Sequence, residues 1–270
     1  MTHSDLINPD TARKFLELLH TRAAAALSHE RRPGVLQLVS ISPDDSGMSV
    51  SPFSVGDVDH MVAAAIIDAR AGRNVFVETR SVRPGRPHER GRGKIESTIG
   101  TFAFVIDHDA DTGKAGHING DTTVVETSPG NHHEWLFLFR ALSAGDAKPL
   151  GDMIRKASGA DHDTGVITQP YRVPGLPCYP TAKKIARGRV TVPTKLIRVS
   201  DKLWTPTEIE GTFSTDGAQV AKVQPPRKPT GSLKSNGRHS GTPRRSAIAK
   251  KKIAAKLPPR WIDQRNSNLR

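Results

Sequence analysis

Two aspartates separated by one residue, Asp107 and Asp109, follow an apolar run that begins at Phe102. The run has the β-branched and aromatic composition of a buried strand. Side chains alternate across a strand, so both carboxylates would lie on one face at the strand's end. Two such carboxylates repel each other unless a cation lies between them, and Mg²⁺ or Mn²⁺ prefers oxygen ligands of this kind. The pair predicts a divalent-metal site suited to phosphate chemistry, although a polar turn also fits an Asp-x-Asp taken alone.

A pair of histidines is the second candidate group. The turn residues Ser-Pro-Gly-Asn at 128–131 lead directly into His132 and His133. Alternation places His133 and Trp135 on one face of the following strand and His132 on the other. We expect His133 to face the cleft, where its ring can donate a hydrogen bond to a phosphate oxygen. A zinc ligand pair and a surface histidine are the alternatives, and the single cysteine, Cys178, argues against a structural zinc site.

An acidic segment after a predicted helix is the third group. It holds Asp161 and Asp163, and either could complete a metal site begun by the first pair; we favour Asp161, which is nearer the helix. Arg172 follows between Tyr171 and a Pro-Gly turn, which would fix the direction of its guanidinium for bidentate phosphate binding. A solvated acidic loop and an ordinary basic segment are the alternative interpretation. Further basic residues follow at Lys183, Lys184, Arg187 and Arg189.

Taken in order, the three groups resemble the motifs of the archaeo-eukaryotic primase superfamily, and most closely the RepB-type primase domains of plasmids and mobile elements. The segments that carry the resemblance are Val105-Ile-Asp-His-Asp109, Thr127-Ser-Pro-Gly-Asn-His-His-Glu-Trp135, Asp161 and Tyr171-Arg-Val-Pro-Gly175, within residues 34–189. The chain departs from the family where Cys-Tyr-Pro-Thr-Ala-Lys183 replaces the usual Asn-Lys. It also passes into a basic tail where a helical domain often follows.

The resemblance implies a DNA primase or primase-polymerase, a nucleotidyltransferase with a two-metal site of Mg²⁺ or Mn²⁺, acting in plasmid or mobile-element replication. It assigns the metals and catalysis to Asp107, Asp109 and Asp161. The nucleotide-binding residues that it implies are His133, Arg172, Ser128, Lys183 and Lys184. The expected partners are a single-stranded DNA template, dNTP or NTP, and a replicative helicase or initiator. Two other functions stay open: a non-catalytic DNA-binding replication protein with the same fold, and a metal-dependent nuclease or relaxase.

The elements that must position these residues follow the order β-α-β-β-β-β-α after an N-terminal helix. This order indicates an α+β fold: a primase-polymerase core with a mostly antiparallel, RRM-like central sheet flanked by helices. A helix is expected at 8–28, with Asn8 as its N-cap and Pro9 in its first turn. Further helices are expected at 55–71 and 150–158, and strands at 34–41, 74–80, 102–106, 123–127 and 133–138. Irregular or extended chain is expected at 84–94, 171–180, 188–199 and 203–213. We divide the chain into an N-terminal helix (1–30), the catalytic core (31–220) and a basic tail (221–270).

Positive charge is concentrated in that tail. Residues 222–270 hold 14 of the 40 Lys and Arg residues and one of the 27 acidic residues, so residues 1–221 carry no net charge. The tail has too few large apolar residues to bury a core, and we expect disorder from about residue 223 with a short helix at 246–256. Such a tail favours nucleic-acid binding, with a solubilising or partner-binding role as the alternative. The basic residues expected to contact DNA are Arg80, Arg83, Arg244, Arg245, Lys250, Lys251 and Lys252.

Several classes of protein are disfavoured. No apolar run approaches the roughly 20 residues that a bilayer-spanning helix needs. The first residues lack the basic and apolar regions of a secretory signal. One cysteine permits no internal disulfide. We therefore expect a cytoplasmic protein without a membrane partner.

Overall fold

The computed structural model describes residues 3–44, 46–85, 91–114 and 120–214. The expected basic tail and its helix lie outside the described residues, as do the DNA contacts expected at Arg244, Arg245, Lys250, Lys251 and Lys252. The divisions drawn at residues 30 and 220 stay predictions. Among the described residues, no helix combines the length and the apolar character that crossing a membrane requires.

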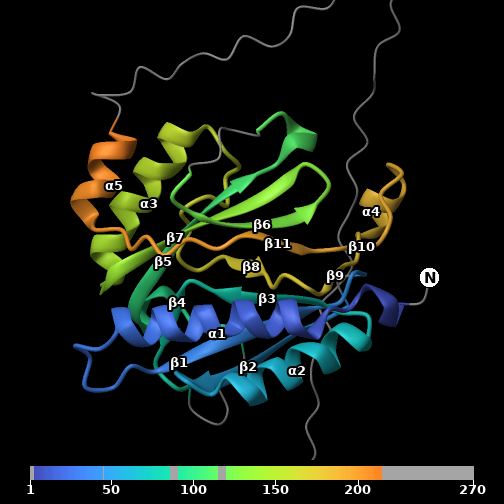
Figure 1. Ribbon diagram of the computed structural model, residues 1–270, viewed down its shortest axis with the longest axis horizontal. Coiled ribbons are helices and arrows are strands. Elements are labelled where there is room, and N and C mark those ends of the chain that lie inside the picture. Colours follow the sequence, from blue (N-terminus) through green and yellow to red (C-terminus); the bar gives the residue numbers. More distant parts are fainter. Residues whose placement is uncertain (1–2, 45, 86–90, 115–119, 215–270) are drawn as a thin grey trace, which may run out of the picture. The chain divides into compact units, whose positions relative to one another are not determined.

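A nine-stranded sheet forms the centre of the described chain (Figure 1), with the strand order β11-β6-β7-β5-β4-β1-β3-β8 and with β2 paired to β1. Its named strand pairs are all antiparallel. The strands are β1 (Val35–Ile41), β2 (Met48–Ser54), β3 (Asn74–Glu78), β4 (Arg80–Val82), β5 (Thr98–His108), β6 (Thr123–Ser128), β7 (Asn131–Leu142), β8 (Pro170–Arg172) and β11 (Lys195–Arg198). A separate ribbon pairs β9 (Pro177–Cys178) with β10 (Val192–Pro193). The expected α+β class with a mostly antiparallel sheet is confirmed.

Helices flank this sheet. The long helices α1 (Pro9–Ala26) and α2 (Val58–Arg70) lie together on one side, and α3 (Ala144–Ser158) lies with α5 (Pro206–Phe213) on the other (Figure 1). Helix α1 begins as the sequence predicts: the side chain of Asn8 accepts a hydrogen bond from the Thr11 backbone N–H at 2.9 Å. Pro9 occupies the first turn, where its missing N–H costs nothing. The short helices are η1 (His3–Leu6), η2 (Ile95–Ser97), η3 (Ala110–Thr112) and α4 (Ala182–Ile185).

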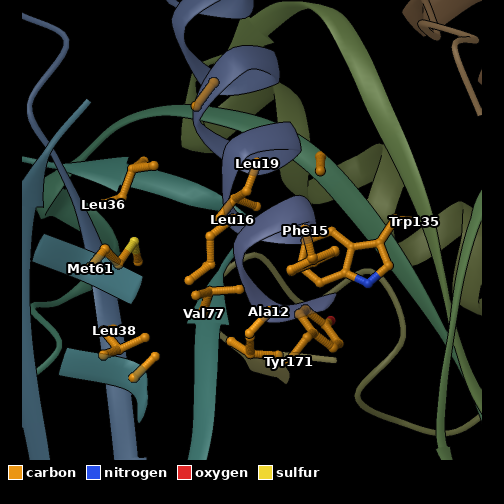
Figure 2. Close-up of a cluster of buried hydrophobic side chains, with 14 of the residues drawn as sticks. Ala12, Phe15, Leu16, Leu19, Leu36, Leu38, Met61, Val77, Trp135 and Tyr171 are labelled. Carbon is orange, nitrogen blue, oxygen red and sulfur yellow. The ribbon is translucent and has the colours of Figure 1, made fainter. Parts of the chain in front are cut away.

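The central strands β5 and β7 are covered on both faces, which explains their continuous apolar composition. Val105 and Trp135 belong to the core under α1 and α2, whereas Ile106 and Leu136 belong to the core under α3 and α5. Figure 2 shows the first core, where Trp135 packs edge-on against Phe15 of α1 at a ring-centroid distance of 5.3 Å. Complete burial of each such side chain stabilises the fold by roughly 2–3 kcal/mol. Helix α1 is thereby held against the strand that carries the histidines.

Several expected elements differ in the structure. The expectation of extended chain over 203–213 is wrong, because Thr205 and Glu208 form a capping box with Pro206 in the first turn and start α5. Helix α3 begins at Ala144, not at 150, since the Ser143 hydroxyl caps it and Pro149 is accommodated inside it. The strand expected over 74–80 is interrupted at Thr79, giving β3 and β4, and β2 was not predicted.

Candidate active site

The β5–β7 pair brings the first aspartate and the second histidine together. Asp107 lies directly opposite His133 in the antiparallel register, so both side chains lie on the same face of the sheet. The His133 Nε2 atom is 3.7 Å from an Asp107 carboxylate oxygen. The next pair along the strands, His108 and His132, lies on the opposite face, where His108 contacts the buried Glu134 at 2.9 Å. The predicted division of faces on the histidine strand therefore agrees with the structure.

The loop after α3 supplies the third carboxylate. The backbone N–H of Asp161 donates to the carbonyl of Asp107 at 2.9 Å, and the Asp107 N–H donates to the Thr164 hydroxyl at 2.9 Å. The Gly165 N–H donates to the carbonyl of Val105 at 2.9 Å. These bonds attach the loop to the edge of β5 that β4 leaves unpaired beyond Ala103. The backbone of Asp161 is thus held beside Asp107, and the role of Asp161 as a metal ligand stays a prediction.

Two glycines make that attachment sterically feasible. Gly165 has φ +68°, and a Cβ atom there would lie 2.3 Å from the carbonyl oxygen of Gly151 in α3. A Cβ atom on Gly151 would lie 2.1 Å from the carbonyl oxygen of Gly165. Any larger side chain at either position would push the loop away from the helix and carry Asp161 with it.

The carboxylates act on one another through their charges. Burial, together with the negative charges of Asp161, Asp163 and Asp109, raises the pKa of Asp107 to about 6, and burial is the largest cause. Burial alone would also raise the pKa of Asp161, but hydrogen bonds from Lys114 and His162 outweigh burial and lower that pKa to about 2. The cluster of Asp107, Asp109, Asp161 and Asp163 consequently contains one carboxylate, that of Asp161, with cationic partners. Asp107 lacks such a partner among the described residues.

Asp109 lies just beyond the end of β5. It caps the short helix η3, and its side chain accepts a hydrogen bond from the Asp111 N–H at 3.1 Å. Its backbone forms an isolated antiparallel bridge with Lys114, whose N–H donates to the Asp109 carbonyl at 2.9 Å. Asp109 therefore stays within electrostatic range of Asp107 while one of its oxygens is used locally.

His133 is a neutral side chain in this setting. Burial and, to a smaller extent, the nearby charge of Arg172 lower the pKa of His133 to about 3. Its ring packs edge-on against Tyr171 at 5.3 Å, and its Nδ1 atom is enclosed without a hydrogen-bond partner among the described residues. A proton on Nδ1 would have no acceptor there, so the tautomer with the proton on Nε2 is favoured. In this tautomer the Nε2–H bond lies on the side of the ring that is nearer to Asp107.

Arg172 has a fixed direction, but for a reason that the sequence did not reveal. Its guanidinium donates to the Asn74 side-chain oxygen at 2.6 Å and stacks 4.8 Å above the Phe76 ring. Asn74 is itself held by two hydrogen bonds with the backbone of Tyr179, both 2.9 Å long. A buried asparagine at the start of β3 is thus the residue that orients Arg172, whereas sequence reasoning assigned this role to the Pro-Gly turn.

The other residues predicted to bind the nucleotide are Ser128, Lys183 and Lys184. The Ser128 hydroxyl is nearly buried and accepts hydrogen bonds from Asn131 and Arg189, each at 3.0 Å. Arg189 also pairs with Asp111. Lys183 and Lys184 are exposed on α4 and make no ion pair with other described residues. The structure does not bring these two lysines to the Asp107 cluster through any described contact.

The expectation that Arg80 contacts DNA is wrong, because its side chain is completely buried. It donates to Glu78 at 2.8 Å, to the Thr98 hydroxyl at 2.8 Å and to backbone carbonyls of residues 92–94. Arg80 therefore anchors the described part of the loop after β4. Arg83 is exposed and lies on the rim of a cavity of about 1240 Å³ between that loop and the β1–β2 hairpin, so its DNA contact stays a prediction.

Metal binding fits the donor chemistry of the cluster but needs a rearrangement. Three aspartates offer hard oxygen ligands, and the charges of Asp161 and Asp109 contribute to the raised pKa of Asp107, which a bound cation would relieve. Among the residues described, no set of three or more His, Cys, Asp or Glu side chains is already arranged to hold a metal ion. Asp161 is bonded to Lys114 at 2.5 Å instead. Sequence reasoning missed Lys114, and its place after an Asp-Thr-Gly turn signals only a loop.

Comparison with known proteins gives similarity at the level of backbone arrangement. No protein-family model matches the chain, and no curated protein matches it at a significant level. The AEP domain of the cyanophage S-2L primase-polymerase has a TM-score of 0.48 at 12% identity, over 70% of this chain and 96% of that one. A crystal structure of primase RepB' has a TM-score of 0.45 at 14% identity, over 72% of this chain and 61% of that one. The catalytic domain of RepB' with initiator DNA has a TM-score of 0.43 at 13% identity, over 72% and 92%. These neighbours are primase domains, and at these identities and TM-scores the likeness does not extend beyond a similar backbone arrangement.

Proposed function

We propose that this chain is a DNA primase or primase-polymerase that transfers nucleotides on a single-stranded DNA template, with dNTP or NTP as substrate and Mg²⁺ or Mn²⁺ as cofactor. One observation carries the proposal. Asp107 lies opposite His133 across two central strands, and the loop bearing Asp161 is hydrogen-bonded to the same strand position. Backbone pairing thus brings together three segments that carry Asp107, His133 and Asp161, and this supports the roles that the sequence resemblance implies for them.

Asp107, Asp109 and Asp161 would hold the metal ions. When bound, these ions lower the pKa of a primer 3′-hydroxyl and stabilise the pyrophosphate leaving group. The raised pKa of Asp107 supports this assignment, because a carboxylate that is costly to ionise alone gains most from a bound cation. Asp163 adds negative charge to Asp107 and remains the alternative third ligand.

His133 and Arg172 would bind the incoming triphosphate. The neutral imidazole can donate its Nε2–H to a phosphate oxygen, and burial keeps the ring from being protonated at physiological pH. The Arg172 guanidinium is held by Asn74 and keeps further donors for phosphate. Because both groups are positioned before the ligand arrives, they would lower the entropic cost of aligning the triphosphate.

The experiment is primer synthesis and extension on single-stranded DNA with labelled nucleotides and Mn²⁺ or Mg²⁺. We expect incorporation by the wild type and background signal from the Asp107→Ala, Asp109→Ala double variant. The chain offers a matched control in a second Asp-x-Asp, Asp57 and Asp59 at the start of α2. The Asp57→Ala, Asp59→Ala variant should keep its activity. Equal activity in the wild type and the Asp107/Asp109 variant would refute the proposal.

A non-catalytic DNA-binding protein with this fold is the second candidate. It is favoured because Asp161 pairs with Lys114 and because the described part of the chain holds no preassembled metal cluster. The two functions differ in their need for the aspartates. DNA binding that is unaffected by a chelator and by the Asp107/Asp109 substitutions, in a protein without nucleotide incorporation, would support the second candidate.

A further inference from the structure

We propose that Lys114 is a placeholder cation: its ammonium group binds the carboxylate of Asp161 and must leave before a divalent ion can bind to that carboxylate. The inference rests on the proposed function, because it concerns the same three aspartates. It assigns a role to a residue that neither the motifs nor the family resemblance singles out.

The contacts of Lys114 place its ammonium group at the acidic cluster. Its Nζ atom is 2.5 Å from Asp161 Oδ1. Its backbone is bridged to Asp109 through the turn that ends at Gly113, where φ is +73°. Asp161 in turn is bonded through its backbone to Asp107. One short turn and one loop therefore place the ammonium group of Lys114 on Asp161, within electrostatic range of Asp109 and Asp107.

Charge supports the same assignment. The pKa of Lys114 is raised, first by its hydrogen bond to Asp161 and then by the charges of Asp161, Asp109 and Asp107. Within the described residues, no other Lys or Arg forms an ion pair with these three aspartates. Lys114, together with His162 when that ring is protonated, thus offsets the mutual repulsion of the carboxylates in the folded chain.

A metal ion would displace Lys114 because both bind the same oxygen atom of Asp161. Asp161 Oδ1 accepts from Lys114 and also from the backbone N–H and ring of His162. A metal ion that takes this oxygen competes directly with the ammonium group. Lys114 can leave at small cost, because 42% of its side chain is exposed and such ion pairs contribute little in water.

The experiment measures Mn²⁺ affinity by calorimetry, and by the electron paramagnetic resonance signal of free Mn²⁺, using the full chain. Lys114→Met removes the competing charge and should bind Mn²⁺ roughly 2- to 5-fold more tightly than the wild type. Lys114→Arg keeps the charge and should bind within about 2-fold of the wild type. The matched control is Lys195→Met, which breaks a 2.9 Å pair with a similarly buried carboxylate, Glu126, and should leave the affinity unchanged.

Unchanged or weaker Mn²⁺ binding in Lys114→Met, with binding retained in the wild type, would overturn the placeholder role and leave the proposed function standing. Absence of Mn²⁺ binding in every variant would overturn both. Tighter binding in Lys114→Met without nucleotide incorporation by the wild type would support the placeholder role while refuting the enzymatic function.

Discussion

Replacing Asp107 by asparagine should stabilise the metal-free protein at high pH. The side chain is 22% exposed and lies 3.7 Å from a neutral histidine, close to three other carboxylates. Its ionisation is therefore costly in the folded state. Asparagine has nearly the same shape and carries no charge, so the variant removes this cost while the backbone bonds of the strand stay in place.

The magnitude follows from the pKa of Asp107, which is about 6 in the folded protein against an ordinary value of 3.8. Between these two pH values the folded protein retains a proton that the unfolded chain has lost, so wild-type stability falls as the pH rises through this window. The full cost, present above the folded-state pKa, amounts to roughly 3 kcal/mol. Screening by water at the exposed part of the carboxylate reduces it to about 2 kcal/mol.

The assay is urea unfolding of the wild type and Asp107→Asn at about pH 4 and about pH 8, with a chelator present. We expect the stability difference in favour of the variant to be roughly 2 kcal/mol larger at the higher pH. The control is Asp59→Asn, because the exposed Asp59 has a lowered pKa caused by its bond to Arg13 and should show a small change of opposite sign. A pH-independent difference for Asp107→Asn would refute the assigned electrostatics of the cluster.

Three further predictions concern the residues that hold the site in place. Arg80→Met should destabilise the fold by roughly 3–5 kcal/mol in urea unfolding, because it leaves the buried Glu78 carboxylate without its main partner; a loss below about 1 kcal/mol would contradict the anchoring role. Gly165→Ala should lower both stability and Mn²⁺ affinity, since the new Cβ atom would collide with α3 and displace Asp161; calorimetry that detects no change in affinity would disprove the coupling. Asn74→Ala should raise the KM for nucleotide more than it lowers kcat, because Arg172 loses its 2.6 Å partner; a change in kcat alone would speak against an orienting role.

Local patterns in the sequence predicted those features that depend on neighbouring residues only. The cap and first turn of α1 at Asn8 and Pro9 were predicted correctly, because capping involves residues three apart. The faces of His132 and His133 were predicted correctly, because strand alternation holds wherever the strand is regular. The capping box at Thr205 carried an equally local signal, and the helix that it starts could have been found from it.

Other features depend on contacts between distant segments. Arg80 and Arg83 both lie in basic sequence near a loop, yet one is completely buried and the other exposed. The Asn74 side chain that orients Arg172 lies in a different strand, and no local pattern connects the two. These assignments follow from sheet order, which the composition of single strands does not determine.

The sequence by itself determined the order of the chemical groups, the strand that carries Asp107 and the face on which His133 lies. The tertiary structure decided that the Asp-x-Asp at 107 and 109 gathers further carboxylates and that the one at 57 and 59 does not: Asp57 and Asp59 lie at a helix start and pair with separate partners, His60 and Arg13. Asp107 instead receives the charge of Asp161 because a distant loop adds its backbone to the edge of β5. Electrostatic energy depends on distance in space, so only the folded chain distinguishes the two pairs and places Lys114 at one of them.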